Sequence, residues 1–124
     1  MRDIIFRGKR VDNSKWTEGY FFKSWNKVFL LWGMTGDCPN MEEVILETVG
    51  QSTGLTDKNG KKIFEGDIVE SPHGTRGVVE WDRAWCAFIV NIGDDWQTMD
   101  DCPYKVISNI YDNGEENESI HGIL

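Results

Sequence analysis

The sequence predicts a mainly β protein folded as a small barrel or sandwich. Roughly seven to nine short apolar runs alternate with turn signals about every ten residues, a spacing typical of all-β domains. Six Trp, six Phe and three Tyr in 124 residues supply the aromatic side chains that pleated sheets favour. No segment shows the period of an amphipathic helix, so helices alternating with strands are not expected.

The N-terminal segment predicts a β-hairpin. Strands are expected over residues 4–11 and 15–22, joined by the Asp-Asn-Ser turn of residues 12–14. A strand places alternate side chains on the same face, so the second strand has an aromatic face. The aromatic residues of that face are Trp16, Tyr20 and Phe22, and Glu18 interrupts them. A third short strand is expected over residues 27–32.

The middle of the chain is rich in residues that interrupt strands. Gly, Asp, Pro and Asn predict a loop over residues 33–43. Residues 41–46 fit either a short helical turn or an edge strand, and residues 49–53 fit a short strand. Asn59-Gly60 predicts a tight turn over residues 57–60, because both residues tolerate a positive φ.

The C-terminal half predicts further short strands with turns between them. These strands cover residues 63–64, 68–70, 77–81, 85–91 and 104–111, with a turn at 71–75 and an acidic loop around Trp96. The strand 85–91 is apolar at both alternating rows, so we expect it to be central and covered on both faces. Cys86 within it is expected to be a core residue.

The chain length fits a single domain, and no transmembrane or secretory segment is expected. The longest apolar run near the N-terminus is Ile4-Ile5-Phe6, far shorter than a secretory signal needs. We therefore expect a cytoplasmic protein. Residues 113–124 are polar and acidic, which predicts a frayed tail.

Charge is distributed unevenly along the chain, whose net charge is −8. Residues 1–32 carry seven basic and three acidic side chains, whereas the remainder carries six basic and eighteen acidic ones. Such asymmetry is typical of proteins that associate with partners, although a solvated surface also explains it.

Three segments together resemble the YopX family of small bacteriophage and prophage proteins. They are MRDIIFRGKRVDNSKWTEGYFF at the start, ETVGQSTGLTDKNGKKIFEGDIVE with GVVEWD in the middle, and KVISNIYDN near the end. The resemblance implies an SH3-type barrel with an added N-terminal β-hairpin arm. It implies one domain over residues 1–112, with the arm at about 1–32 and the barrel core at about 48–112. It also implies an origin in a phage or prophage, and brings no catalytic motif.

Every catalytic or metal-binding pattern is incomplete in the sequence. The turn at residues 57–60 lacks the Glu that a calcium loop needs at its twelfth position, where Ile68 stands. The cysteines are scattered without a C-x-x-C pair, which disfavours zinc. Gly93-Asp94-Asp95 is too short a match to indicate a metal site, and His73 has no predicted nucleophile. We therefore predict no enzyme, no cofactor and no metal.

A binding function is the prediction that remains, and its partner is expected to be a protein of the phage or the host. The basic candidates lie on the hairpin, and the acidic candidates flank Trp96. These interaction candidates are Arg7, Lys9, Arg10 and Trp16 on the basic side, and Asp94, Asp95, Asp100 and Asp101 on the acidic side. Unlike charges favour a homo-oligomer. Basic groups beside aromatic rings also suit nucleic acid, which the pI of 4.7 disfavours.

Overall fold

The computed structural model describes residues 4–99 and 103–112, and it divides the chain into two compact units, Met1–Ser52 and Thr53–Leu124. The described residues form eleven β-strands and one short 3₁₀ helix, so the predicted mainly β class is confirmed. The predicted tail at residues 113–124 lies outside the described residues.

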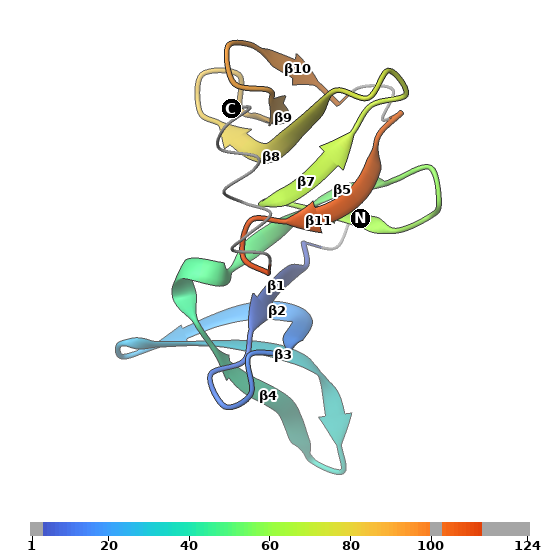
Figure 1. Cartoon of the computed structure of the whole chain (residues 1–124). Helices are drawn as coiled ribbons and strands as arrows, with labels where there is room; N and C mark the ends of the chain where they lie inside the picture. The colour runs from blue at the N-terminus through green and yellow to red at the C-terminus, as the bar shows by residue number, and fades with distance from the viewer. Residues whose placement is uncertain (1–3, 100–102, 113–124) are drawn as a thin grey trace. The chain divides into compact units, whose positions relative to one another are not determined.

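The first unit is an antiparallel sheet with the strand order β4-β3-β2-β1-β5 (Figure 1). Its strands are β1 (Phe6–Lys9), β2 (Trp16–Ser24), β3 (Lys27–Thr35), β4 (Cys38–Val44) and β5 (Gly50–Thr56), with the 3₁₀ helix η1 (Leu46–Thr48) before β5. β1 and β2 pair antiparallel, which confirms the predicted hairpin. β5 begins in this unit, and the sheet continues from it to β6 (Lys62–Phe64) of the second unit.

The sheet of the first unit curls, so that the end of β4 returns to the end of β1. An isolated bridge joins Arg10 to Val44, and backbone hydrogen bonds run from Val11 N to Glu43 O and from Ile45 N to Lys9 O. The concave side holds a small core of Val28, Leu30 and Val44, against which Phe6 and Val49 pack. We call this concave side the inner face.

Two glycines permit this curvature. A Cβ atom at Gly19 would lie 2.3 Å from the carbonyl oxygen of Leu31, closer than any side chain tolerates. A Cβ atom at Gly8 would lie 3.1 Å from the Cβ atom of Val44. The absence of side chains at these two positions therefore lets β2 approach β3, and β1 approach β4.

The predicted loop over residues 33–43 is wrong. β3 extends to Thr35, and β4 pairs with it from Cys38 onwards, with an irregularity in register between Leu31 and Met34. The breaker residues form a short turn, in which Gly36 takes a φ of +62°. Cross-strand pairing thus overrides the local preference of Pro39 and Asn40, which β4 tolerates at the edge of the sheet.

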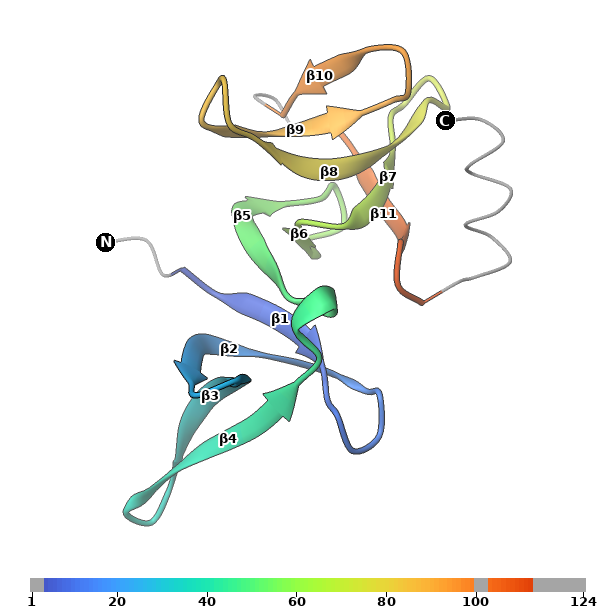
Figure 2. The same ribbon diagram turned by 90° about the vertical axis from the view of Figure 1, so that its left-hand side faces the viewer.

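The second unit is built around an antiparallel sheet with the order β10-β9-β8-β7-β11, in which β8 lies between β7 and β9 (Figures 1 and 2). These strands are β7 (Asp67–Glu70), β8 (Arg76–Asp82), β9 (Ala87–Asn91), β10 (Trp96–Thr98) and β11 (Lys105–Asn109). Its main core contains Ile63, Val69, Val79, Val90, Met99, Tyr104 and Val106. The predicted turns at residues 57–60 and 71–75 are confirmed by backbone hydrogen bonds within each.

Two details of the predicted C-terminal half are wrong. β9 begins at Ala87, because residues 83–86 form the turn after β8, and Cys86 is exposed there with a φ of +51°. Cys86 is therefore not a core residue. Trp96 begins β10 by pairing with Asn91, so it does not lie in a loop.

The expectation of a closed barrel is also corrected, because the described strands form two open sheets. In the first unit an isolated bridge, rather than a ladder, joins β4 to β1. In the sheet of the second unit, the outer strands β10 and β11 end the strand order. Closure requires a continuous ladder between first and last strands, and neither sheet has one among the described residues.

Asp57 ties the turn at residues 57–60 to β11. Its Oδ1 accepts hydrogen bonds from the backbone N–H groups of Asn59 and Lys61, at 2.8 and 2.9 Å, and its Oδ2 accepts one from Val106 N at 3.1 Å. Burial by itself raises the pKa of this carboxyl, but these donors and nearby Lys61 outweigh burial and lower the pKa below its ordinary value.

Replacing Asp57 by alanine leaves three backbone donors without their acceptor. We expect the free energy of unfolding at pH 7 to fall by about 3 kcal/mol, measured by urea denaturation. Asp37→Ala, in an exposed turn, is the control and should change it by less than about 0.5 kcal/mol.

The effect of Asp57→Ala should depend on pH. Because the folded state lowers the pKa, the carboxylate stabilises the fold fully above its unfolded pKa of about 3.9, and this contribution disappears as the pH falls through the folded pKa. The difference between wild type and Asp57→Ala should therefore be constant from about pH 7 to pH 5 and shrink below about pH 4. A difference that stays constant down to pH 2 would contradict this role.

Candidate interaction face

The convex side of the first unit carries a set of apolar side chains, which Glu18 interrupts between Trp16 and Tyr20. In the β2–β3 pairing Tyr20 lies opposite Leu31 and Phe22 opposite Phe29, and in the β3–β4 pairing Leu31 lies opposite Met41. Cross-strand partners share a face, and so do alternate residues of one strand. We call this side the outer face, and its apolar residues are Trp16, Tyr20, Phe22, Phe29, Leu31 and Met41.

The outer face is accessible to solvent over much of its area. Tyr20 is 54% exposed, Phe22 is 48% exposed and Met41 is 47% exposed, while Trp16, Phe29 and Leu31 are partly buried. The rings of Phe22 and Phe29 lie 6.3 Å apart between centroids. Large contiguous apolar patches mark interaction sites on many proteins, so the outer face is the candidate interaction face of this unit.

Two cations lie beside Trp16 at one end of the outer face. The guanidinium carbon of Arg7 lies 4.6 Å from the centre of the Trp16 ring system, and Lys9 Nζ lies 5.5 Å from it. Both distances are within the range of a cation–π interaction. Arg7 is only 8% exposed, so a partner has little access to it, whereas Lys9 is partly exposed and accessible to a partner.

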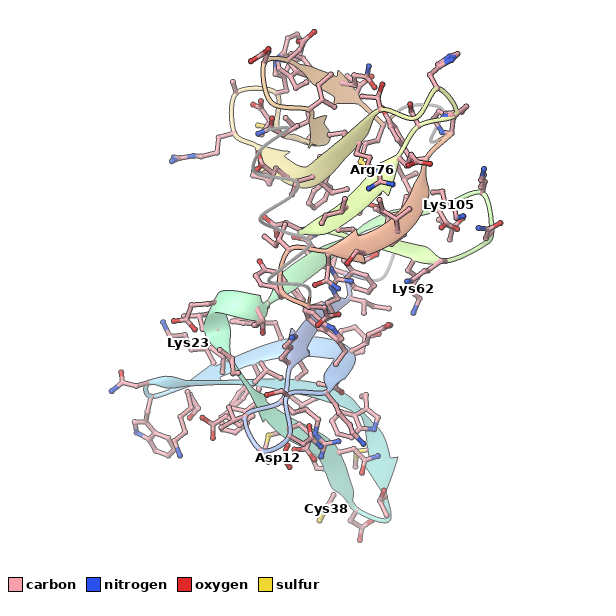
Figure 3. All side chains as sticks on the ribbon, viewed as in Figure 1. Asp12, Lys23, Cys38, Lys62, Arg76 and Lys105 are labelled. Atoms are coloured by element: carbon pink, nitrogen blue, oxygen red, sulfur yellow. The ribbon has the colours of Figure 1, made fainter. Side chains whose placement is uncertain are left out.

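The structure separates Arg10 from the other basic candidates. Arg10 follows Lys9, so it lies on the opposite side of the strand, where Nη2 contacts Glu42 Oε1 at 2.6 Å. Its Nε also lies 3.4 Å from Oδ1 of Asp12, which sits in the β1–β2 turn (Figure 3). Of the predicted basic set, Arg7, Lys9 and Trp16 are thus brought together, and Arg10 instead bridges β1 to β4.

The acidic candidates belong to the second unit. Asp94 and Asp95 are exposed in the turn between β9 and β10, where Asp95 Oδ1 accepts a hydrogen bond from Trp96 N at 2.8 Å. Asp100 and Asp101 lie outside the described residues. The first unit carries seven basic and seven acidic residues, and the second carries six and fourteen, so the second unit accounts for the whole net charge of −8.

The groups considered for catalysis are scattered. His73 lies in the exposed turn between β7 and β8, and Cys38 and Cys86 are exposed in different units. Figure 3 shows Cys38 near the β3–β4 turn. Within residues 4–99 and 103–112, no group of three or more His, Cys, Asp or Glu side chains is placed to hold a metal ion. Nor does that part of the chain contain a helix long and apolar enough to cross a membrane.

Sequence reasoning missed half of the outer face. Trp16, Tyr20 and Phe22 follow from the two-residue period within one strand, but Phe29, Leu31 and Met41 belong to strands whose register the sequence leaves open. Met41 also fell where the predicted loop overlapped residues 41–46, which fitted either a helical turn or an edge strand. The apolar run from Val28 to Leu31 was the available signal, since it supplies side chains to both faces of the sheet.

The comparisons with known proteins agree with this fold. The model of the family described as YopX protein matches residues 5–116. The chain belongs to the YopX family. This YopX protein is also similar to the crystal structure of protein EF1440 from Enterococcus faecalis, with a TM-score of 0.58 and 23% sequence identity. That alignment covers 94% of this chain and 99% of the other, and identity at this level indicates a shared fold. No curated protein matches the chain significantly.

The exposed aromatic residues should be dispensable for folding. We expect the double variant Tyr20→Ser/Phe22→Ser to lose about 1–2 kcal/mol in urea denaturation, because the Phe22–Phe29 contact is its main loss. Binding of an apolar fluorescent dye should fall at the same time. Leu30→Ala, at a fully buried inner-face position, should cost about 2–5 kcal/mol. Equal losses in the two variants would contradict the assignment of the two faces.

Proposed function

We propose that this YopX protein is a non-enzymatic interaction module that binds a protein of the phage or its bacterial host through the outer face of its first unit. The observation that carries the proposal is the exposure of Tyr20, Phe22 and Met41 on one continuous sheet face. Aromatic and Met side chains are enriched in the cores of protein interfaces.

The charge around the outer face supports a protein partner. Lys9 lies at the β1 end, and Lys27 contacts Glu43 at 3.9 Å on the same side of the sheet. The first unit as a whole is neutral. An apolar centre bordered by a few charges of both signs resembles a protein-binding patch, whereas a nucleic-acid surface is strongly basic.

Site-specific photo-crosslinking tests this proposal. A benzoyl-phenylalanine at position 22 should yield a discrete adduct with another protein in the producing cell, because Phe22 is exposed within the apolar outer face. The same group at position 23 is the matched control, since Lys23 is exposed but lies opposite Val28, on the other side of β2 from Phe22. Tyr20→Asp should abolish the adduct at position 22 by placing a charge in the interface.

The identity of the adduct separates the possible protein partners. Adducts of equal yield at positions 22 and 23 would overturn the assignment of the face. An adduct between two copies of this chain would assign the outer face to a homo-oligomer, and its size in multi-angle light scattering would give the number of subunits.

A second candidate function, binding of single-stranded nucleic acid, is favoured by the contact of Arg7 and Lys9 with Trp16. Under this candidate, a single-stranded oligonucleotide is retained on a filter at about 50 mM salt and released at about 200 mM salt. Lys9→Ala should then make the slope of log affinity against log salt concentration less steep, by about the amount that corresponds to one phosphate contact. Absence of retention at low salt would exclude the candidate.

A further inference from the structure

A second exposed aromatic feature lies in the second unit. Trp85 is 66% exposed and Trp96 is 38% exposed, and their ring centroids lie 5.6 Å apart with an angle of 51° between the planes. Trp85 lies in the turn that precedes β9 and Trp96 begins β10, just after the turn that follows β9, and these two turns lie at opposite ends of β9 (Figure 2). We call Trp85 and Trp96 the tryptophan pair.

Side-chain hydrogen bonds fix both turns. Asp82 Oδ1 accepts from Ala84 N at 2.8 Å and from Trp85 N at 3.1 Å. In the other turn, Asp95 Oδ1 accepts from Trp96 N. Turns held in this way present their tryptophans in one geometry, which reduces the entropy lost when a ligand binds.

Acidic residues lie in β8 and in the turn before β10, near the tryptophan pair. Glu80 of β8 and Thr98 of β10 both lie opposite Ile89 of β9, so they are on the same face of the sheet. Trp96 is two residues before Thr98 in β10 and therefore shares that face with Glu80. Asn91, opposite Trp96, donates a hydrogen bond from Nδ2 to Glu80 Oε2 at 3.2 Å. Residues 77–99 contain four acidic side chains and one basic side chain, Arg83.

Exposed indole rings beside carboxylates match the chemistry of a cation. An indole face attracts a guanidinium or ammonium group, and a neighbouring carboxylate adds charge attraction and a hydrogen-bond acceptor. The first unit shows the same chemistry within this chain, where Arg7 lies over Trp16 at 4.6 Å. The second unit has the rings and the carboxylates, and its net charge of −8 attracts cations over a longer range.

We propose that the tryptophan pair, together with Glu80, binds an arginine side chain of a basic segment in a protein partner. The site is distinct from the outer face, since it belongs to the other unit and binds a cationic rather than an apolar ligand. A YopX protein with both sites connects two partners, an apolar one and a basic one.

Binding of a capped tetra-arginine peptide tests the site through the six indole N–H signals in ¹⁵N NMR spectra of the full chain. The signals of Trp85 and Trp96 should shift saturably, whereas that of Trp25, which is 91% exposed in the first unit, should not. A capped tetra-glutamate peptide should shift neither. Shifts of similar size at Trp25, or shifts that never saturate, would overturn the proposal.

Variants separate the site from general charge attraction. Glu80→Gln and Trp96→Ala should each weaken peptide binding by fivefold or more, and Trp25→Ala should leave it unchanged. Glu65→Gln, on the same unit but outside residues 77–99, removes an equal charge and should have less than a twofold effect. Equal losses of peptide affinity in Glu80→Gln and Glu65→Gln would show that binding depends on net charge alone, and would overturn the proposed site.

The same variants separate this inference from the proposed function and from self-association. Tyr20→Ser/Phe22→Ser should retain peptide binding, and Glu80→Gln should retain the crosslink from position 22. Sedimentation of the wild type and Trp85→Ala tests a second copy as the occupant. A dimer that dissociates in Trp85→Ala would assign the tryptophan pair to self-association and contradict the proposal.

Discussion

The curl of the β1–β4 sheet is the constraint on which the first unit depends. It requires close backbone approach at Gly19, where a Cβ atom would collide with Leu31 of the neighbouring strand, and a tight contact of Gly8 with the side chain of Val44. It is fixed by the bridge between Arg10 and Val44 and by the contact of Arg10 with Glu42. Because a curled sheet encloses one side only, Leu30 and its neighbours form a core and the aromatic residues of the other side remain outside.

The separation into two faces places the neighbouring basic residues Lys9 and Arg10 in different surroundings. Arg10 lies on the enclosed side and connects two strands, while Lys9 lies beside Trp16 on the open side. Charge that looks continuous along the sequence is therefore divided in space by the two-residue period of the strand. Arg10 therefore has a structural role, whereas Lys9 borders the apolar outer face.

In the second unit, several carboxylates stabilise turns by accepting backbone hydrogen bonds. Asp57 accepts three backbone hydrogen bonds, and Asp82 and Asp95 each fix a turn that presents a tryptophan. Part of the strong acidity of this unit is thus used in turns, and the exposed remainder supports the proposed cationic partner. The two units present exposed aromatic residues in surroundings of different charge, and we propose a separate type of contact for each.

The sequence by itself determined the β class, the first hairpin, the turns at residues 57–60 and 71–75 and half of the outer face, because these depend on local patterns of two to four residues. Only the tertiary structure decided the β3–β4 pairing, the open sheets, the exposure of Cys86 and the proximity of Trp85 to Trp96. Those features depend on register and curvature between strands. Neither is encoded in the composition of a single strand, because hydrogen-bond ladders accept many side chains and cross-strand packing selects among the possible registers.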